Sequence, residues 1–222
     1  MHRADKIKQR ISLLRFFITQ RFVGFPVPDN PHLDKESTAL FMSLIRDCRF
    51  YLEYGSGGST VVAARLNQRF VSVETDRRYL KSVRKKIGSP SPNQRLVYAH
   101  IGLTGLWGSP VRTKRLTAQR LKHWTDYLEA PWQFMGPDES PDLILIDGRF
   151  RVAATLTCCA HLLESSDVSI LVDDYVERPH YHVIEKYATL TATVGGMAIF
   201  RPALKDVHEL KTAIAQYSGD WG

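Results

Sequence analysis

The sequence predicts an α/β fold with a doubly wound, mostly parallel seven-stranded sheet and helices on both faces. Short apolar runs alternate with helical patterns along most of the 222 residues, and this alternation is typical of strands joined by crossover helices. Two of the runs, 142–147 and 168–174, have continuous apolar centres, as strands buried on both faces do. A glycine-rich turn at 55–58 separates the first apolar run from a helical one.

The elements can be assigned in order from these patterns. Strands are predicted at 50–54, 70–73, 95–101, 142–147, 168–174, 189–194 and 197–201. Helices are predicted at 34–46, directly after the glycine turn, and at 77–87, 117–128, 151–163, 179–187 and 205–217. Pro179 suits the first position of a helix, and Gly195-Gly196 suits the turn of a closing hairpin.

The length fits a single domain spanning 1–222. A basic N-terminal helix and a proline-containing linker take up 1–35, the core takes up 36–202, and a C-terminal helix takes up 203–222. The segment 103–141 is too long for a simple crossover, and long segments of this kind are usually functional. We therefore expect this insertion to lie near a ligand site.

The N-terminal helix is both basic and periodic. Its apolar residues recur at helical spacing at Ile7, Ile11, Leu14 and Ile18. Such a helix packs on its own domain or on a second subunit of a homodimer, or it lies on an anionic membrane surface. No run approaches the roughly 20 apolar residues of a membrane span.

Composition restricts the environment and the partners. The apolar content of 44% suits a globular protein, and the net charge of +7 permits anionic partners such as nucleic acid. Cys48, Cys158 and Cys159 are odd in number, and two of them are adjacent in an apolar helix. That usage suits a reduced protein better than a disulfide framework, and no signal peptide is evident, so we expect a cytoplasmic location.

The chemistry is predicted around the glycine turn. Gly55, Gly57 and Gly58 form a turn that lets a ligand approach the backbone closely. Ser59 and Thr60 are suited to cap the following helix. An acidic residue about 20 residues after the first glycine, at the tip of the second strand, can accept hydrogen bonds from a ribose diol. Glu74 occupies that place.

Two residues distinguish the ligand. A dinucleotide fingerprint requires glycine or alanine where this chain has Thr60. Glu53, just before the turn, would repel a pyrophosphate and attract a ligand that carries an ammonium or sulfonium group. The alternative is a purely structural turn with an incidental acidic residue beside it.

In these residues the chain resembles the class I S-adenosylmethionine-dependent methyltransferases, over roughly 36–202. Glu53, Gly55 and Gly57 match the first motif of that family, and Glu74 matches its second-strand acid. The resemblance implies a Rossmann-like methyltransferase fold whose last strand is antiparallel. It also implies cofactor contacts from Glu53, Tyr54, Gly55, Ser56, Gly57, Ser59, Thr60, Glu74, Thr75, His100, Ile101 and Asp147. His100 departs from the family pattern, which often has an acid there.

Three more carboxylates follow the central strands. Asp147, and the pair Asp173-Asp174, resemble the ligands of metal-dependent O-methyltransferases of the catechol and macrocin types. The resemblance implies a Mg²⁺ or Mn²⁺ site at these residues, and hard oxygen ligands suit those ions. Asp147 and Arg149 are the catalytic candidates, although sugar-modifying members usually have an acid where Arg149 stands. The alternative is that Asp173 or Asp174 caps the next helix.

Several functions agree with this pattern. The first is methyl transfer from S-adenosylmethionine to a hydroxyl of a small or glycan-like acceptor. Nucleic-acid methylation is an alternative that the charge favours, but no Asn/Asp-Pro-Pro-aromatic motif is present. A non-catalytic S-adenosylmethionine-binding protein is a third possibility. An aminopropyl transferase similar to spermidine synthase expects an acidic acceptor pocket, and the basic insertion argues against it.

The insertion supplies candidates for an acceptor pocket. Its aromatic residues can line such a pocket or pack in the core: Trp107, Trp124, Tyr127 and Trp132. It also carries the cations Arg112, Lys114, Arg115, Arg120 and Lys122.

Overall fold

The computed structural model describes residues 24–111, 116–136, 138–163, 165, 167–203 and 206–222, together with Ser12, Ile18 and Thr19. Most of the predicted N-terminal helix lies outside the described residues. The insertion cations at 112–115 do so as well.

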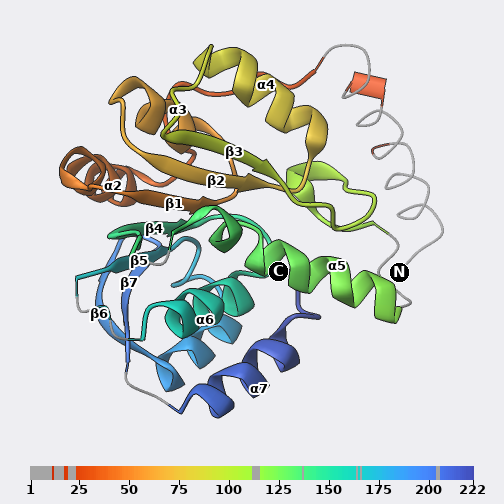
Figure 1. Ribbon diagram of the computed structural model, residues 1–222, viewed down its shortest axis with the longest axis vertical. Helices are drawn as coiled ribbons and strands as arrows, with labels where there is room; N and C mark the ends of the chain where they lie inside the picture. The colour runs from red at the N-terminus through yellow and green to blue at the C-terminus, as the bar shows by residue number, and fades with distance from the viewer. Residues whose placement is uncertain are drawn as a thin grey trace.

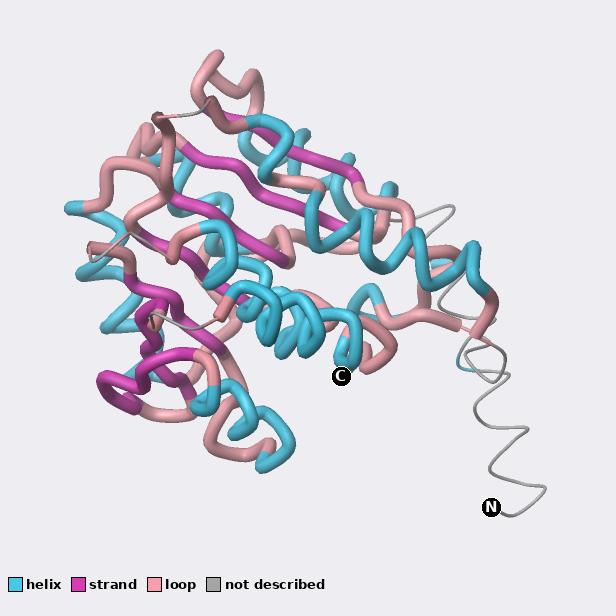
Figure 2. The backbone as a smooth tube through the Cα atoms, turned by 60° about the horizontal axis from the view of Figure 1, so that its bottom comes forward, coloured by secondary structure: helices cyan, strands magenta, loops and turns pink. Residues whose placement is uncertain are grey.

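A seven-stranded sheet, whose strands are magenta in Figure 2, forms the centre of the molecule. Its strand order is β3-β2-β1-β4-β5-β7-β6. Its strands are β1 (Tyr51–Tyr54), β2 (Phe70–Glu74), β3 (Gln94–Tyr98), β4 (Leu143–Ile146), β5 (Ser169–Val172), β6 (Ala188–Val194) and β7 (Met197–Pro202). The first five strands pair in parallel, and β7 runs antiparallel to both of its neighbours. The predicted fold class, including its antiparallel last strand, is confirmed.

Helices cover both faces of the sheet (Figure 1). One layer contains α2 (Lys35–Asp47), α3 (Gly58–Arg65) and α4 (Arg77–Ile87). The other contains α5 (Ala118–Glu129), α6 (Arg151–His161), the 3₁₀ helix η3 (Pro179–Lys186) and α7 (Val207–Tyr217). Each layer packs on its own apolar cluster, so the central strands β1, β2, β4 and β5 are buried on both sides.

Alternation along β1 assigns its side chains to the two layers. Leu52 and Tyr54 belong to the cluster under α5, α6 and α7. Tyr51 belongs to the opposite cluster, under α2, α3 and α4. Glu53 bonds to α3 and therefore lies on that same side. A charged residue is thus placed inside an apolar layer, and its hydrogen bonds shape the site described below.

Two elements differ from the sequence prediction. The third strand ends at Tyr98 instead of Ile101, because the chain beyond it turns away to meet α5, where the Ile101 carbonyl accepts from Trp124 Nε1 at 3.0 Å. The segment 179–186 forms a 3₁₀ helix. Its bonds span three residues, as in the 2.8 Å bond from the Tyr181 amide to the Arg178 carbonyl.

The linker before α2 is fastened to α3 and α4. Asp29 forms ion pairs with Arg65 and, at 2.8 Å, with Lys86. A Cβ atom on Gly58 would lie only 1.8 Å from the Asn30 carbonyl oxygen, so the first residue of α3 must be glycine for the linker to cross there. This crossing carries the chain to the carboxyl ends of the strands.

Two further features concern the cysteines and the lengths of the helices. Cys158 and Cys159 are buried, Cys48 is half-buried, and all three are free. No described helix is both long enough and apolar enough to cross a membrane.

We predict that Gly58→Ala destabilises the protein, because its methyl group overlaps backbone atoms of the linker. The free energy of unfolding, measured by urea denaturation, should fall by about 1–3 kcal/mol, as overpacking typically does. Gly57→Ala is the matched control, since a Cβ there meets only Tyr79 Oη at 3.8 Å. Equal stability of the two variants would show that the linker does not cross α3 in this way.

Candidate functional site

The turns after β1 and β4 touch each other. Gly55 has φ +101°, and a Cβ there would lie 2.8 Å from the Gly148 nitrogen and 2.9 Å from the Asp147 carbonyl carbon. Both the left-handed conformation and the close approach therefore require glycine. Gly57 differs from Gly55, because its backbone is extended and the space that a Cβ atom would occupy there is nearly empty. The turn thus leaves backbone exposed to a ligand at Gly57.

Glu53 holds this turn from beneath. Its carboxyl group is fully buried and accepts hydrogen bonds from the hydroxyls of four residues. These are Tyr51 at 3.0 Å, Ser72 at 2.6 Å, Thr60 at 2.5 Å, and Ser59. Burial raises the pKa of Glu53, and these hydroxyl bonds oppose the rise. The carboxyl therefore joins β1, β2 and α3.

This arrangement differs from the sequence-based interpretation of Glu53 as a charge that faces a ligand. The Ser59 and Thr60 hydroxyls, predicted as helix caps, donate to Glu53. Thr60 Oγ1 also accepts from the Gly57 amide at 2.9 Å, which fixes the peptide at the start of α3. The polar residues of the motif thus serve to shape the turn.

Tyr54 and Ser56 also bond within the protein. The Tyr54 hydroxyl donates to the Leu128 carbonyl at 2.5 Å, so this side chain is directed toward α5. Ser56 Oγ lies 2.7 Å from Ser72 Oγ. What Tyr54 offers the site is its backbone, whose carbonyl accepts from the Asp147 amide at 3.0 Å.

Glu74 ends β2 as predicted and is only 8% exposed. Its Oε1 accepts from the Thr75 amide at 2.6 Å, the Asp76 amide at 2.8 Å and the Thr75 hydroxyl at 3.2 Å. Burial raises the pKa of Glu74 to about 7, against the opposing effect of the amide bonds. This carboxyl group changes its charge near neutral pH.

A loop from the insertion lies over Glu74, a particular contact that the sequence patterns do not identify. It contains the short 3₁₀ helix η1 (Leu106–Gly108). The Gly108 carbonyl accepts from Thr75 Oγ1 at 3.4 Å, and a Cβ on Gly108 would be 3.6 Å from Glu74 Oε1. Trp107, at the tip, is 74% exposed, and its ring lies 5.6 Å from that of His32 in the linker.

His100 and Ile101, two of the residues predicted to contact the cofactor, separate in the structure. Ile101 is buried and belongs to the apolar cluster under α5. His100 is exposed, and its Nδ1 lies 3.0 Å from Tyr98 Oη. Its ring makes an edge contact with His123 at 5.0 Å. Ile101 is therefore part of the core, and only His100 of the two has a side chain open to a ligand.

Asp147, Asp173 and Asp174 come together around one side chain, that of Arg151. Arg151 Nη2 lies 2.9 Å from Asp147 Oδ1. Its Nη1 lies 3.0 Å from Asp174 Oδ2 and 3.3 Å from Asp173 Oδ2. Asp174 also pairs with Arg178 at 2.8 Å. The sequence placed the three acids correctly at one edge but missed the cation between them.

These residues do not fit the predicted Mg²⁺ or Mn²⁺. The carboxylates on which such an ion would depend are already paired with the buried guanidinium of Arg151. Within the described part of the chain, no group of three or more His, Cys, Asp or Glu residues is arranged to hold a metal. Burial raises the pKa of Asp147 and of Asp173, while Arg151 opposes both shifts.

Arg149, the second catalytic candidate, stands apart from this ion cluster. Among the described residues its buried Nε has no hydrogen-bond partner, and the Tyr127 hydroxyl has none either. Burial lowers the pKa of Arg149. Tyr127 and Trp124 are 1% exposed and belong to the core, so neither lines an open pocket.

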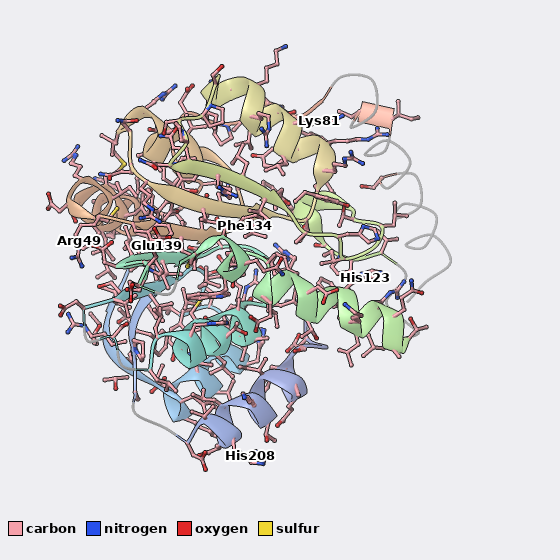
Figure 3. All side chains as sticks on the ribbon, viewed as in Figure 1. Arg49, Lys81, His123, Phe134, Glu139 and His208 are labelled. Carbon is pink, nitrogen blue, oxygen red and sulfur yellow. The ribbon has the colours of Figure 1, made fainter. Side chains whose placement is uncertain are left out.

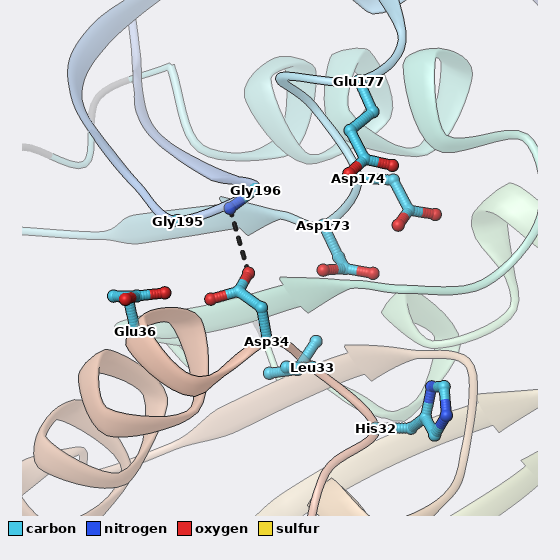
Figure 4. Close-up of a pocket in the computed structure, with 9 residues that line it drawn as sticks. All are labelled: His32, Leu33, Asp34, Glu36, Asp173, Asp174, Glu177, Gly195 and Gly196. Atoms are coloured by element: carbon cyan, nitrogen blue, oxygen red, sulfur yellow. Dashed lines mark hydrogen bonds between the residues drawn. The ribbon is translucent and has the colours of Figure 1, made fainter.

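A cavity of about 480 Å³ opens beside the ion cluster (Figure 4). The end of β5, the turn between β6 and β7, and the start of α2 surround it. Its lining residues are His32, Leu33, Asp34, Glu36, Asp173, Asp174, Glu177, Gly195 and Gly196. Five of these residues are acidic, and only His32 among them can carry positive charge. The cavity therefore differs from the basic acceptor pocket expected from the insertion.

Asp34 keeps part of that negative charge fixed. It accepts from the amides of Ser37 and Gly196, both at 2.9 Å. With the Ser37 hydroxyl, these bonds hold the pKa of Asp34 well below its usual range. The basic surface lies elsewhere, on α4, where Lys81 is exposed (Figure 3).

Comparison with known proteins agrees with this fold. A methyltransferase-like protein from Silicibacter pomeroyi superposes with a TM-score of 0.69 at 28% sequence identity, over 85% of this chain and 99% of the other. The two chains share one fold. No protein-family model matches the sequence, and no curated protein matches it.

Two O-methyltransferases superpose less well. One is from Bacillus cereus in complex with S-adenosylhomocysteine, with a TM-score of 0.44, 19% identity, and coverage of 86% of this chain and 91% of the other. The other is TomG from Streptomyces achromogenes in complex with S-adenosylmethionine, with a TM-score of 0.46, 16% identity, and coverage of 88% and 99%. These two scores are too low to support an inference about this chain.

We predict that Glu74 makes stability depend on pH. The native state keeps its proton up to about pH 7, whereas the unfolded chain releases it near its ordinary value of 4.5. The stabilisation of the native state by this proton is therefore complete below pH 4.5 and is lost as the pH rises to 7. Over that range the free energy of unfolding of the wild type should fall by up to about 3 kcal/mol relative to that of Glu74→Gln. Urea denaturation of both proteins across this range measures it, with Glu139→Gln as an exposed control. A constant difference between wild type and Glu74→Gln would contradict the shifted pKa.

Proposed function

We propose that the chain is an S-adenosylmethionine-dependent methyltransferase that acts on a hydroxyl group of a small-molecule or glycan acceptor. The main observation behind this proposal is that the backbone is open at Gly57 and that a carboxylate, Glu74, ends the neighbouring strand. The fold shared with a methyltransferase-like protein supports it, and ligands of such sheets bind outside the carboxyl ends of the strands.

The cofactor has matching groups in this site. Gly57, where a Cβ would fill open space, admits the ligand against the backbone, and Ser56 and Thr75 flank the turn and the strand end. Glu74 as a carboxylate accepts from ribose hydroxyls. Asp147, 27% exposed, lies where the two turns meet.

Glu53 contributes without direct contact. Its four hydroxyl bonds fix the positions of β1, β2 and α3, so it supports the turn that receives the cofactor. S-adenosylmethionine supplies a methyl group on a positively charged sulfur. The protein's contribution is to hold the acceptor in line with that group, and such positioning removes several kcal/mol from a reaction barrier.

The acidic cavity is the proposed acceptor site. Asp173 connects the two regions, because it lines the cavity and also pairs with Arg151, which holds Asp147. Fixed carboxylates repel phosphates, so this cavity favours an uncharged or positively charged acceptor. Nucleic acid, which the overall charge of +7 permitted, is correspondingly disfavoured at this position.

One further activity is favoured by a specific observation. Transfer of an aminopropyl group to an amine requires an acidic acceptor pocket, and the described cavity is acidic. Its donor is decarboxylated S-adenosylmethionine. Tighter binding of that donor than of S-adenosylmethionine would favour this second candidate. Binding of S-adenosylmethionine without turnover on any acceptor would indicate a non-catalytic binding protein.

We predict that Gly57→Val abolishes binding of S-adenosylhomocysteine, because the side chain fills the space that the ligand needs. Glu74→Ala should weaken binding by about 1.5–3 kcal/mol through loss of hydrogen bonds to a charged group. Isothermal titration calorimetry measures both, and Gly136→Val, in a loop away from the site, is the control. Wild-type affinity in the Gly57 variant would show that the turn is purely structural.

The acceptor assignment predicts a charge preference. In pairs of hydroxylated compounds that differ by one phosphate, the unphosphorylated member should show the higher kcat/KM. Glu177→Gln should narrow this difference, because it removes one negative charge from the cavity wall. The assay follows methyl transfer from labelled S-adenosylmethionine, with Glu139→Gln as the control. Preference for the phosphorylated members would place the acceptor elsewhere on the protein.

A further inference from the structure

The acids predicted to bind a divalent ion surround a guanidinium group instead. We infer that Arg151 takes the place of a metal at this site, so that the proposed methyl transfer proceeds without a divalent cation. The statement about methyl transfer rests on the proposed function. The contacts of Arg151 with the three acids do not depend on any activity.

All three guanidinium nitrogens of Arg151 are engaged. Besides the three carboxylates, its Nε donates to the Gly148 carbonyl at 3.2 Å and its Nη1 donates to the Asp173 carbonyl at 2.5 Å. The side chain is only 4% exposed. It therefore bridges the turn after β4 and the end of β5, which is the span that a bound metal ion would have to bridge.

The start of α6 directs this side chain into place. Phe150, directly before the helix, adopts a left-handed conformation with φ 58° and is fully buried. A bulky residue rarely adopts this conformation unless the surrounding packing imposes it. Arg151 lies four positions after Asp147, and the two side chains pair across the turn that leads into α6.

A metal ion at this position would be electrostatically unfavourable. It would lie close to a buried guanidinium and repel it. If the ion displaced the guanidinium, a positive charge would remain buried without its partners, which strongly destabilises a protein. The residual negative charge of the cluster is reduced further by Arg178, which pairs with Asp174.

Arg151 is thus a positioning residue. It orients Asp173 and Asp174 at the wall of the acceptor cavity and holds Asp147 beside the glycine turn. A metal would perform the same orientation, but it would also polarise the acceptor oxygen directly. The Arg151 guanidinium faces carboxylates and backbone carbonyls, so it does not polarise the acceptor oxygen as a metal would.

The test measures Mn²⁺ binding by electron paramagnetic resonance of the free ion, using the full chain. Wild type should leave Mn²⁺ free, whereas Arg151→Ala should bind one Mn²⁺ at least about tenfold more tightly, because it frees three convergent carboxylates. Adding Asp173→Asn to Arg151→Ala should remove the gain. Arg178→Ala is the matched control, since it deletes a cation of the same cluster and leaves Arg151 in place.

Two outcomes would overturn the inference. One is stoichiometric Mn²⁺ binding by wild type that Asp173→Asn abolishes. The other is folded Arg151→Ala, verified by circular dichroism, with no gain in binding. If that variant does not fold, the wild-type titration still decides, together with turnover that is unchanged in EDTA. Calorimetric binding of S-adenosylhomocysteine tests the proposed function separately, so failure of one proposal is distinguishable from failure of the other.

Discussion

The fully buried carboxyl group of Glu53 is the constraint on which the site depends. A carboxyl group in the core is costly unless hydrogen bonds satisfy it, and here hydroxyls from β1, β2 and α3 do so. Those bonds set the distance between the two strands and the helix that begins after the glycine turn. The open backbone at Gly57 and the position of Glu74 both follow from this clamp.

A second polar cluster, formed by Arg151 and its carboxylate partners, fixes the neighbouring strands β4 and β5 in position. Arg151 joins the turn after β4 to the end of β5, and Gly55 lets the turn after β1 touch the turn after β4. The chain therefore connects the proposed cofactor region at β1 and β2 with a cavity at β5 through buried ionic and backbone contacts. Rigid connections of this kind suit a reaction that depends on the alignment of two molecules.

The sequence predicted the fold well because the fold is determined by local patterns. Continuous apolar runs, turn glycines and helical periodicity are visible without any knowledge of tertiary contacts, and each core strand and helix was found near its true limits. The strand-end acids were placed correctly for the same reason, since parallel strands bring their carboxyl ends to one edge of the sheet.

What the sequence could not give were the partners of those acids. Glu53 reads as a ligand-facing charge until the hydroxyls around it are located in space, and Arg151 reads as an ordinary first-turn residue of an apolar helix. The loop over Glu74 and the acidic cavity arise from segments far apart in the chain, as the contact between Trp107 and His32 shows. Two features of the sequence point to the loop over Glu74: the length of the insertion, and the pair of glycines that flank Leu106 and Trp107.

The clamped glycine turn and Glu74 together form the proposed cofactor site. A crystal structure of the protein grown with S-adenosylhomocysteine tests this site most directly. We expect ligand density across the carboxyl ends of β1 and β2, with ribose oxygens within hydrogen-bonding distance of the Glu74 carboxylate. Ligand density elsewhere on the protein, with Glu74 still covered by the loop at 106–108, would contradict it.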